Sequence, residues 1–111
     1  MIAFGELSLS FTSRLWVWQG KGAWFFVTLP AGSADEVRFF ASDQMAGRRR
    51  GFGSLRVQAS IGEAANQSRW QTSIFPDKKR GSYLLPIKAA IRQSQGLHEG
   101  DEVTVHITLI E

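Results

Sequence analysis

The sequence contains three consecutive arginines followed by a phenylalanine between two glycines. Arg48, Arg49 and Arg50 precede Phe52 in the stretch RRRGFG. Guanidinium groups bind phosphates through a planar fork of donors, and an exposed phenylalanine ring can stack on a nucleobase. One interpretation is that this loop binds an anionic ligand or nucleic acid. The alternative is that the arginines are solvated surface side chains without a specific ligand, because short basic runs are common in loops.

Further basic residues follow in the middle of the chain. Residues 48–92 carry ten basic and two acidic side chains, whereas residues 93–111 carry four acidic side chains and no lysine or arginine. This asymmetry can steer an anionic partner to the middle segment, unless folding places the acidic end beside it and cancels the field. The residues that we predict to extend an anion site from the arginine run are Arg56, Lys88 and Arg92, with a second basic loop at residues 78–80.

Aromatic residues are concentrated in the first third of the chain. The candidate pocket aromatics are the four tryptophans, Trp16, Trp18, Trp24 and Trp70. Such rings can form a stacking platform or the wall of an apolar pocket at the mouth of a barrel. They can also fill the interior of a small barrel, since each large ring buries about 150 Å² or more. We expect core packing for most of the aromatics in the first third, with Trp16 or Trp18 as the exposed exception.

The sequence carries no signature of catalysis or of metal binding. Cysteine is absent, which excludes disulfides and thiolate chemistry, and His98 and His106 lie eight positions apart without a second ligand at metal spacing. We therefore predict no catalytic residues, no metal site and no cofactor. The alternative of a small-molecule enzyme would require ionisable side chains to meet in one cleft, drawn from Tyr83, His98, His106, Arg56 and Lys88.

Alternating apolar and polar residues predict that strands dominate the fold. The first third of the chain predicts a long hairpin, with strands over residues 7–18 and 23–29 joined by the glycine-containing turn 19–22. Later strands are predicted over residues 55–61, 68–75, 83–85 and 103–109, with a turn at residues 62–67. A polar loop, residues 76–81, separates the second and third of these.

Two short helices are predicted between the strands. The first spans residues 33–46, because Ser33 and Glu36 form a capping box and Gly47 suits a helix end. The second spans residues 87–93, with Pro86 in its first turn and Gly96 closing it. About six strands and two short helices predict a mainly β fold, a closed or nearly closed barrel in a single domain over residues 1–111. Closure would also protect the hydrophobic strand at residues 16–18 from lying at a sheet edge.

Five strand and turn segments follow one another in a recognisable order: residues 24–30 (WFFVTLP), 55–62 (LRVQASIG), 70–76 (WQTSIFP), 81–88 (GSYLLPIK) and 96–105 (GLHEGDEVTV). This order resembles a small bacterial family known as domain of unknown function 1905. The match spans nearly the whole chain, roughly residues 4–110. The resemblance implies a small β-barrel of the double-split type, and it implies no activity.

The last quarter of the chain has a second likeness. Residues 85–92 (LPIKAAIR), followed by Gly96-Leu97 and by residues 99–101 (EGD), are similar to the proline, helix, Gly-Leu and Gly-Asp run of AbrB-type and MazE-type DNA-binding barrels. Those regulators are about half as long as this chain and complete their barrel by dimerising. A chain that supplies enough strands for its own barrel departs from that pattern.

These observations predict a non-enzymatic binding module for an anionic or small apolar partner. The alternative is a DNA-binding regulator of the AbrB type, which would be an obligate dimer; we favour a monomer. Neither a membrane-spanning run nor a signal peptide is recognisable in the 111 residues, so we expect a cytoplasmic protein. Nucleic acid is one possible anionic partner, and the sequence does not identify the ligand.

Overall fold

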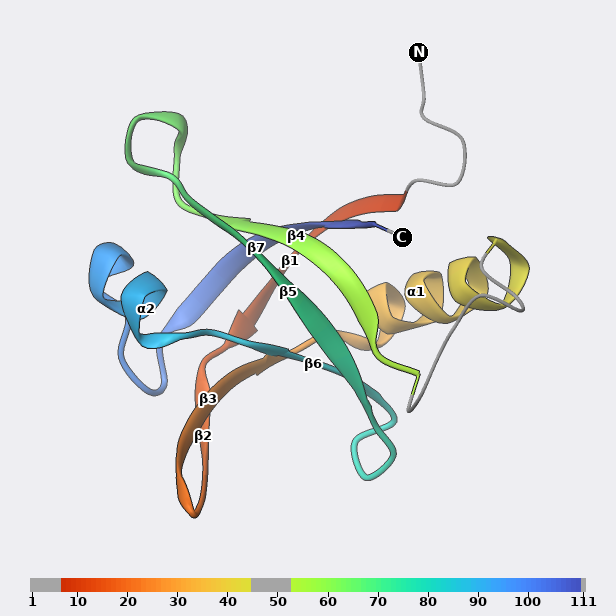
Figure 1. Ribbon diagram of the computed structural model, residues 1–111, viewed down its shortest axis with the longest axis horizontal. Coiled ribbons are helices and arrows are strands. Elements are labelled where there is room, and N and C mark those ends of the chain that lie inside the picture. The colour runs from red at the N-terminus through yellow and green to blue at the C-terminus, as the bar shows by residue number, and fades with distance from the viewer. Residues whose placement is uncertain (1–6, 45–52, 111) are drawn as a thin grey trace.

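The computed structural model describes residues 7–44 and 53–110 and shows a mainly β fold with two α-helices and one short 3-10 turn (Figure 1). All strand pairs are antiparallel. The strands are β1 (Leu7–Arg14), β2 (Trp16–Gly20), β3 (Gly22–Thr28), β4 (Leu55–Ile61), β5 (Ser68–Asp77), β6 (Ser82–Pro86) and β7 (Glu102–Leu109). The helices are α1 (Ala31–Gln44) and α2 (Ala89–Gln95), and the 3-10 turn is Ala64–Asn66.

The seven described strands form an open half-barrel, so the prediction of a closed barrel of about six strands is wrong. Their order is β1-β7-β4-β5-β6-β3-β2, which leaves β1 and β2 as the two edges. The additional strand arises because the first arm of the predicted hairpin breaks into β1 and β2 at Leu15. The hydrophobic strand β2 therefore lies at an edge, contrary to the expectation that closure would cover it.

Leu15 is the corner at which the chain leaves one edge of the sheet and enters the other. Its side chain is fully buried. Its backbone N–H donates to the carbonyl of Asp101 at 2.9 Å, and its carbonyl accepts from the N–H of Gly100 at 2.8 Å. These two bonds extend the pairing of β1 by one residue into the turn before β7, and from Trp16 onward the chain pairs with β3 instead.

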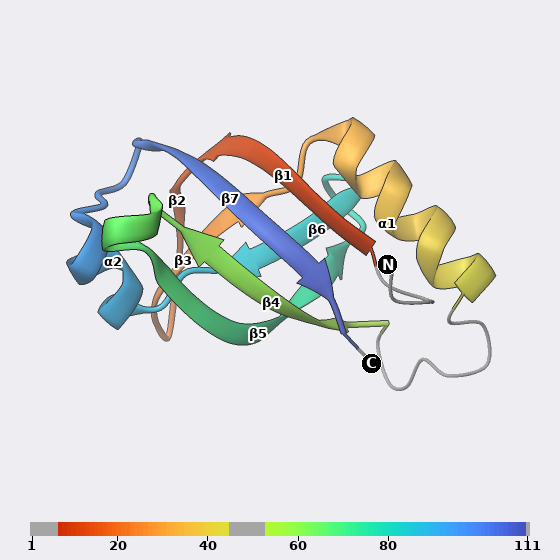
Figure 2. The same ribbon diagram turned by 90° about the horizontal axis from the view of Figure 1, so that it is seen from above.

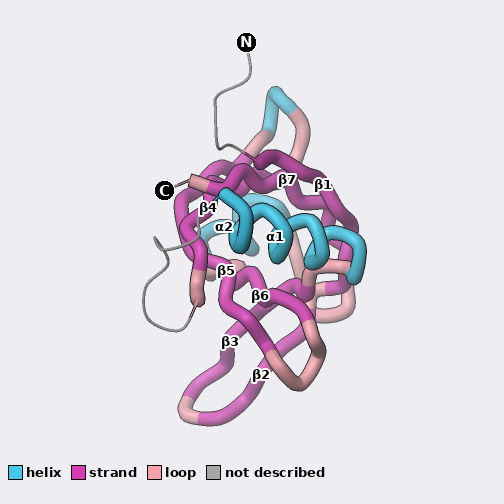
Figure 3. The backbone as a smooth tube through the Cα atoms, turned by 90° about the vertical axis from the view of Figure 1, so that its right-hand side faces the viewer, coloured by secondary structure: helices cyan, strands magenta, loops and turns pink. Residues whose placement is uncertain are grey.

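The core fills the concave side of the sheet, and the helices cover its two ends. The inward residues of β4 and β7 are fully or almost fully buried, as are those of α1 at helical spacing, namely Ala34, Val37, Phe40 and Ala41. The two helices lie at opposite ends of the strands (Figure 2). Seen from the end where α1 lies, the strands curve around that helix (Figure 3).

β5 changes its pairing partners part-way along its length. Residues Ser68 to Ile74 pair with β4, and residues Phe75 to Asp77 pair with β6. The ladder between β5 and β6 ends at the pair Phe75–Leu84. Beyond this point the two strands no longer pair, although β6 continues along β3 as far as Pro86.

Pro86 explains why that ladder ends. The carbonyl of Tyr83 accepts from Leu29, and the N–H of Ile87 donates to Phe25, so these residues of and after β6 bond toward β3. Because alternate residues of a strand bond to opposite neighbours, Pro86 faces β5. Proline has no N–H to donate, so the next rung toward β5 lacks one of its two hydrogen bonds at the point where the strands separate.

Both helices are shifted relative to the prediction. α1 begins at Ala31, with the carbonyl of Pro30 accepting from the N–H of Ala34 at 2.9 Å, so Ser33 lies inside the first turn and does not cap it. The predicted end at Ala46 and the glycine at position 47 lie outside the described residues. α2 begins at Ala89 and not at Ile87, because the N–H of Ile87 is bonded to β3.

The predicted closure of the second helix by Gly96 is confirmed, although the helix runs to Gln95 and not to residue 93. Gly96 adopts the left-handed conformation with φ 63°, and the N–H of Leu97 donates to the carbonyl of Arg92 at 2.8 Å. This bond is the one expected of a Schellman motif. The turn predicted at residues 19–22 and the strand predicted at residues 55–61 are confirmed as well.

Two adjacent leucines on β6 test the assignment of inner and outer faces. Leu85 is fully buried, whereas Leu84 is half-buried on the outer face. We expect Leu85→Ala to lower the free energy of unfolding by about 2–5 kcal/mol, because it leaves a cavity in the core. Leu84→Ala, the matched control, should cost about 1 kcal/mol or less. Urea denaturation measures both, and equal losses would contradict the assignment.

Candidate functional site

A row of large apolar side chains lies on the outer face of β2, β3, β5 and β6. Trp18 and Trp24 pair across β2 and β3, as do Trp16 and Phe26, whose ring centroids are 5.3 Å apart. Residues that pair directly across antiparallel strands point to the same face. The exposed fractions are 49% for Trp18, 55% for Trp24 and 44% for Phe75. Exposed apolar patches of this kind mark interaction sites.

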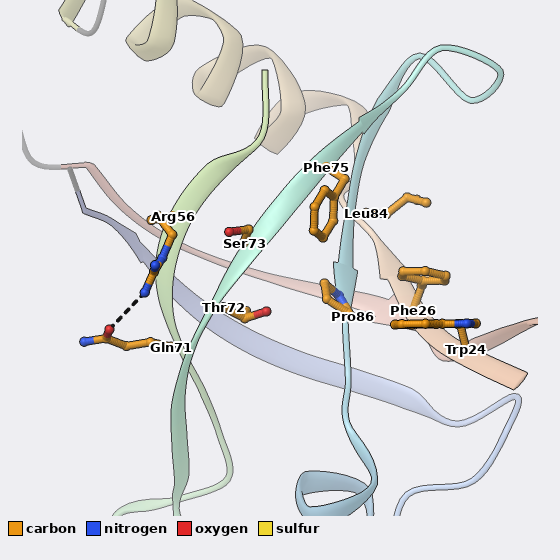
Figure 4. A pocket seen from close by; sticks show the side chains of 9 residues that line it. All are labelled: Trp24, Phe26, Arg56, Gln71, Thr72, Ser73, Phe75, Leu84 and Pro86. Atoms are coloured by element: carbon orange, nitrogen blue, oxygen red, sulfur yellow. Dashed lines mark hydrogen bonds between the residues drawn. The ribbon is translucent and has the colours of Figure 1, made fainter. Parts of the chain in front are cut away.

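The point where β5 and β6 separate opens into a groove of about 530 Å³, called here the central groove (Figure 4). Aromatic and proline side chains from β3, β5 and β6 form one side, and polar side chains of β4 and β5 form the other. Arg56 donates from Nη2 to Oε1 of Gln71 at 3.3 Å, which holds the guanidinium beside the groove. The lining residues are Trp24, Phe26, Arg56, Gln71, Thr72, Ser73, Phe75, Leu84 and Pro86.

A second hollow of about 310 Å³, the helix groove, adjoins the central groove toward α2. It shares Trp24 with the central groove and is also lined by Phe25, Trp70, Lys88 and Arg92. The Arg92 guanidinium carbon lies 3.7 Å from the centroid of the Phe25 ring, and its Nε donates to the carbonyl of Ile87 at 3.1 Å. These contacts hold the charged group over the ring.

A third hollow of about 740 Å³, the hairpin groove, lies on the other side of Phe26 and Leu84. Trp16 and Trp18 line it together with Lys79 and Arg80. The Arg80 guanidinium carbon lies 4.1 Å from the Trp16 ring centroid, and the indole Nε1 of Trp16 donates to Oγ1 of Thr28 at 2.9 Å. The Trp16 ring is therefore held by the Arg80 cation over its face and by the hydrogen bond from its nitrogen to Thr28.

Asp77 is the acidic residue of these three grooves, and its charge is satisfied locally. Its carboxylate accepts a hydrogen bond from Nη1 of Arg80 at 2.7 Å and another from the backbone N–H of Lys79 at 3.1 Å. The hydrogen bond from Arg80 lowers the pKa of Asp77 below its ordinary value, and the charge of Arg80 and the backbone bonds act in the same direction against a smaller effect of burial. The cations that line the three grooves are Arg56, Lys79, Arg80, Lys88 and Arg92.

The structure brings most of the predicted site residues to the three adjoining grooves. Arg56 lines the central groove, and Lys88 and Arg92 line the helix groove. Trp24 lines both of these, and Trp70 lines the helix groove while remaining 7% exposed. Trp16 and Trp18 line the hairpin groove. The predicted residues that lie outside the described part of the chain are Arg48, Arg49, Arg50 and Phe52.

The expectation that most aromatics of the first third are buried is wrong. Phe11 is buried, but Trp24 is more exposed than Trp18, and Trp16, Phe25 and Phe26 are only half-buried. The core is filled instead by the aliphatic residues of β4 and β7. Since β2 and β3 form an edge hairpin, one of their faces has no second layer over it within the described residues.

Sequence reasoning did not select Phe26, Phe75 and Pro86 as site residues. The exposure of Phe75 could have been predicted from the alternation along its strand. Phe75 lies on the same face as the polar residues Gln71 and Ser73, and Ile74, on the opposite face, is buried. An aromatic residue on a polar face of a strand indicates an exposed ring. Phe26 had no such signal, since its strand is apolar on both faces.

The ionisable residues considered for an enzyme do not share one cleft in the described chain. Tyr83 is 4% exposed in the core, and His106 lies on the outer face of β7, where its Nδ1 is 2.8 Å from Oγ of Ser10. His98 is in the turn after α2, 3.8 Å from a carboxylate oxygen of Asp101. Within residues 7–44 and 53–110, no three His, Asp or Glu side chains converge as a metal site would need.

A comparison with known protein families identifies the family of this chain. Residues 11–107 match the family described as Domain of unknown function (DUF1905). The chain belongs to this family. The DUF1905 match covers every strand described here except the first residues of β1 and the last residues of β7. A comparison with curated proteins gives no match for this DUF1905 chain. The described part of this DUF1905 protein contains no helix long and apolar enough to cross a membrane.

The ion pair beside the hairpin groove gives a pH-dependent prediction. Because the folded-state pKa of Asp77 is lowered, its stabilising contribution is present above the ordinary value of 3.8 and is lost as the pH falls through the folded-state pKa. Asp77→Asn should lower the free energy of unfolding by about 1 kcal/mol near neutral pH, and the difference from the unmodified protein should shrink as the pH falls below 3.8. Urea denaturation midpoints of the two proteins, compared at neutral pH and at a pH below 3.8, measure this difference in stability.

Asp35→Asn is the matched control for that experiment. Asp35 pairs with Arg38 at 2.9 Å with the same spacing of three residues, but its side chain is 74% exposed, against 14% for Asp77. The control should change the midpoint less than Asp77→Asn near neutral pH. A destabilisation by Asp77→Asn that is the same at both pH values would contradict the assignment.

Proposed function

We propose that the central groove binds an anionic partner that carries a planar apolar group. The observation that supports this most directly is the exposed Trp24 ring beside Phe26, with the Arg56 guanidinium on the opposite side of the same groove. A ring left 55% exposed is a surface that a planar group can cover. The arginine supplies charge and directional donors for an anion at the edge of the same hollow.

The local charge supports an anionic rather than a cationic or neutral partner. Five cationic side chains line the three grooves, and the acidic Asp77 is paired with Arg80. A low-dielectric apolar wall beside these cations concentrates their field at the groove. The partner's charge would therefore meet Arg56 on one side or Arg92 on the other, while its apolar part covers Trp24.

Binding of anilinonaphthalene sulfonate, an anionic probe with planar rings, tests this function. Trp24→Ala should weaken binding of the probe about tenfold, which is about 1.4 kcal/mol, since the ring that the probe covers is removed. Arg56→Gln should weaken it up to about fivefold, the effect expected for one exposed ion pair. Fluorescence titration of each variant measures the dissociation constant.

Phe39→Ala and Arg14→Gln are the matched controls. Phe39 is a 71% exposed ring on α1, and Arg14 is an exposed cation on β1, and neither lines the central groove. Both variants should bind the probe as the unmodified protein does. Probe binding that is insensitive to Trp24→Ala and Arg56→Gln, or equally sensitive to the controls, would contradict the proposed function.

A further inference from the structure

The central groove adjoins the two other grooves, and the helix groove also reaches Phe25, which alternates with Trp24 and Phe26 along β3 and packs against the core. The central groove shares Phe26 and Leu84 with the hairpin groove, and it shares Trp24, Gln71, Thr72 and Pro86 with the helix groove. The three hollows therefore follow one another across β2, β3, β6 and β5. A ligand that occupied all of them would be much longer than a group that fits beside Trp24 alone.

Each of the three hollows combines an aromatic ring with a cation. The hairpin groove has Trp16 with Arg80, the central groove has Trp24 with Arg56, and the helix groove has Phe25 with Arg92. A repeated pair of ring and cation fits a polymer that carries one planar ring and one negative charge in each repeat. Single-stranded nucleic acid has this composition, with a base and a phosphate in every nucleotide.

We propose that this surface binds single-stranded nucleic acid, an inference that rests on the proposed function of the central groove. Bases stack on aromatic rings and also on the planes of guanidinium groups, and phosphates pair with lysine and arginine. The guanidinium carbons of Arg80 and Arg92 already lie over aromatic rings, 4.1 and 3.7 Å from the ring centroids, so each groove holds a cation beside a surface on which a base can stack. The exposed ring of Trp24 lies between them along the path.

The same features disfavour two other polyanions. Duplex nucleic acid keeps its bases paired and stacked inside the helix, where they cannot reach Trp24 or Phe75. A sulfated polysaccharide such as heparin offers negative charge without a planar aromatic ring, so it would use the cations and leave the rings uncovered. Single strands would use both, since their bases are free to turn toward the sheet.

Charge and stacking make different contributions that one experiment can separate. The affinity for a single strand should fall as the salt concentration rises. The slope of the logarithm of the association constant against the logarithm of the salt concentration should be about −0.7 for each phosphate that is neutralised. Engagement of three to five cations predicts a slope between about −2 and −3.5. Loss of a ring should lower the affinity at every salt concentration and leave the slope unchanged, because stacking releases no counterions.

Fluorescence anisotropy with labelled oligo(dT) and oligo(rU) of about 12 nucleotides, titrated with the full chain, tests the inference. Trp24→Ala should weaken binding by roughly 5- to 150-fold with the same salt slope. Arg56→Gln should weaken binding and make the slope shallower by about 0.7. Phe39→Ala and Arg14→Gln should change neither the affinity nor the slope. The DNA and RNA arms show which sugar is preferred.

Competition with heparin and with a duplex of the same length identifies the outcomes that would overturn the inference. Displacement of the labelled single strand by either competitor as readily as by unlabelled single strand would show charge-driven binding without stacking. Duplex that binds more tightly than single strand would instead favour a DNA-binding regulator of the AbrB type. No effect of Trp24→Ala on oligonucleotide binding would also overturn it.

The two proposals fail in distinguishable ways. If anilinonaphthalene sulfonate binding depends on Trp24 and Arg56 but neither oligonucleotide binds, the proposed function stands and the inference of nucleic-acid binding is wrong. If the probe does not depend on these residues either, both proposals are wrong. Trp24 and Arg56 are exposed, so their replacement should leave the fold intact, and urea denaturation of each variant verifies this.

Discussion

The candidate site depends on one missing hydrogen bond donor. Pro86 lies where β6 would otherwise donate to β5, so the ladder between these strands ends at Phe75 and Leu84. β5 remains paired with β4 on its other side, and β6 remains paired with β3. The two strands are thus held by different neighbours as they separate, and the space between them becomes the central groove. A residue with a backbone N–H at position 86 would remove the reason for this separation.

The exposed rings follow from the open architecture. The half-barrel encloses its core between the concave side of the sheet and the two helices, and the aliphatic residues of β4 and β7 fill much of that space. The hairpin of β2 and β3 extends at one edge, where its outer face has no covering layer in the described structure. Trp18 and Trp24 are therefore free to contact a partner, while the cross-strand contacts between Trp16, Phe26 and Thr28 keep the neighbouring rings ordered.

The sequence predicts the strands well and the site only in part. Alternation over residues 55–61 and 103–109 is a direct consequence of one face being buried, so those strands and their inward residues could be read. Pro86 was ambiguous, because a missing donor is tolerated equally at a helix start and where a strand loses its neighbour. The break at Leu15 could not be predicted, since it is fixed by bonds to Asp101 and Gly100, far away in the sequence. The exposure of Trp24 depends on which strand lies at the edge, which is a property of the whole sheet. The sequence points to Arg56, Lys88 and Arg92 by their charge alone. The fold places aromatic rings in the same grooves as these cations.

Binding at the central groove is tested most directly by a map of backbone amide and indole chemical shifts by NMR as oligo(dT) is added to the protein. We expect the perturbed signals to be the indole of Trp24 and the amides of Gln71, Thr72 and Ser73, which line the central groove. The amide signals of β7 from Thr104 to Thr108 should not shift, because β4 separates this strand from β5. Perturbations that cluster on β7 or α1, with the Trp24 indole unchanged, would contradict binding at the central groove.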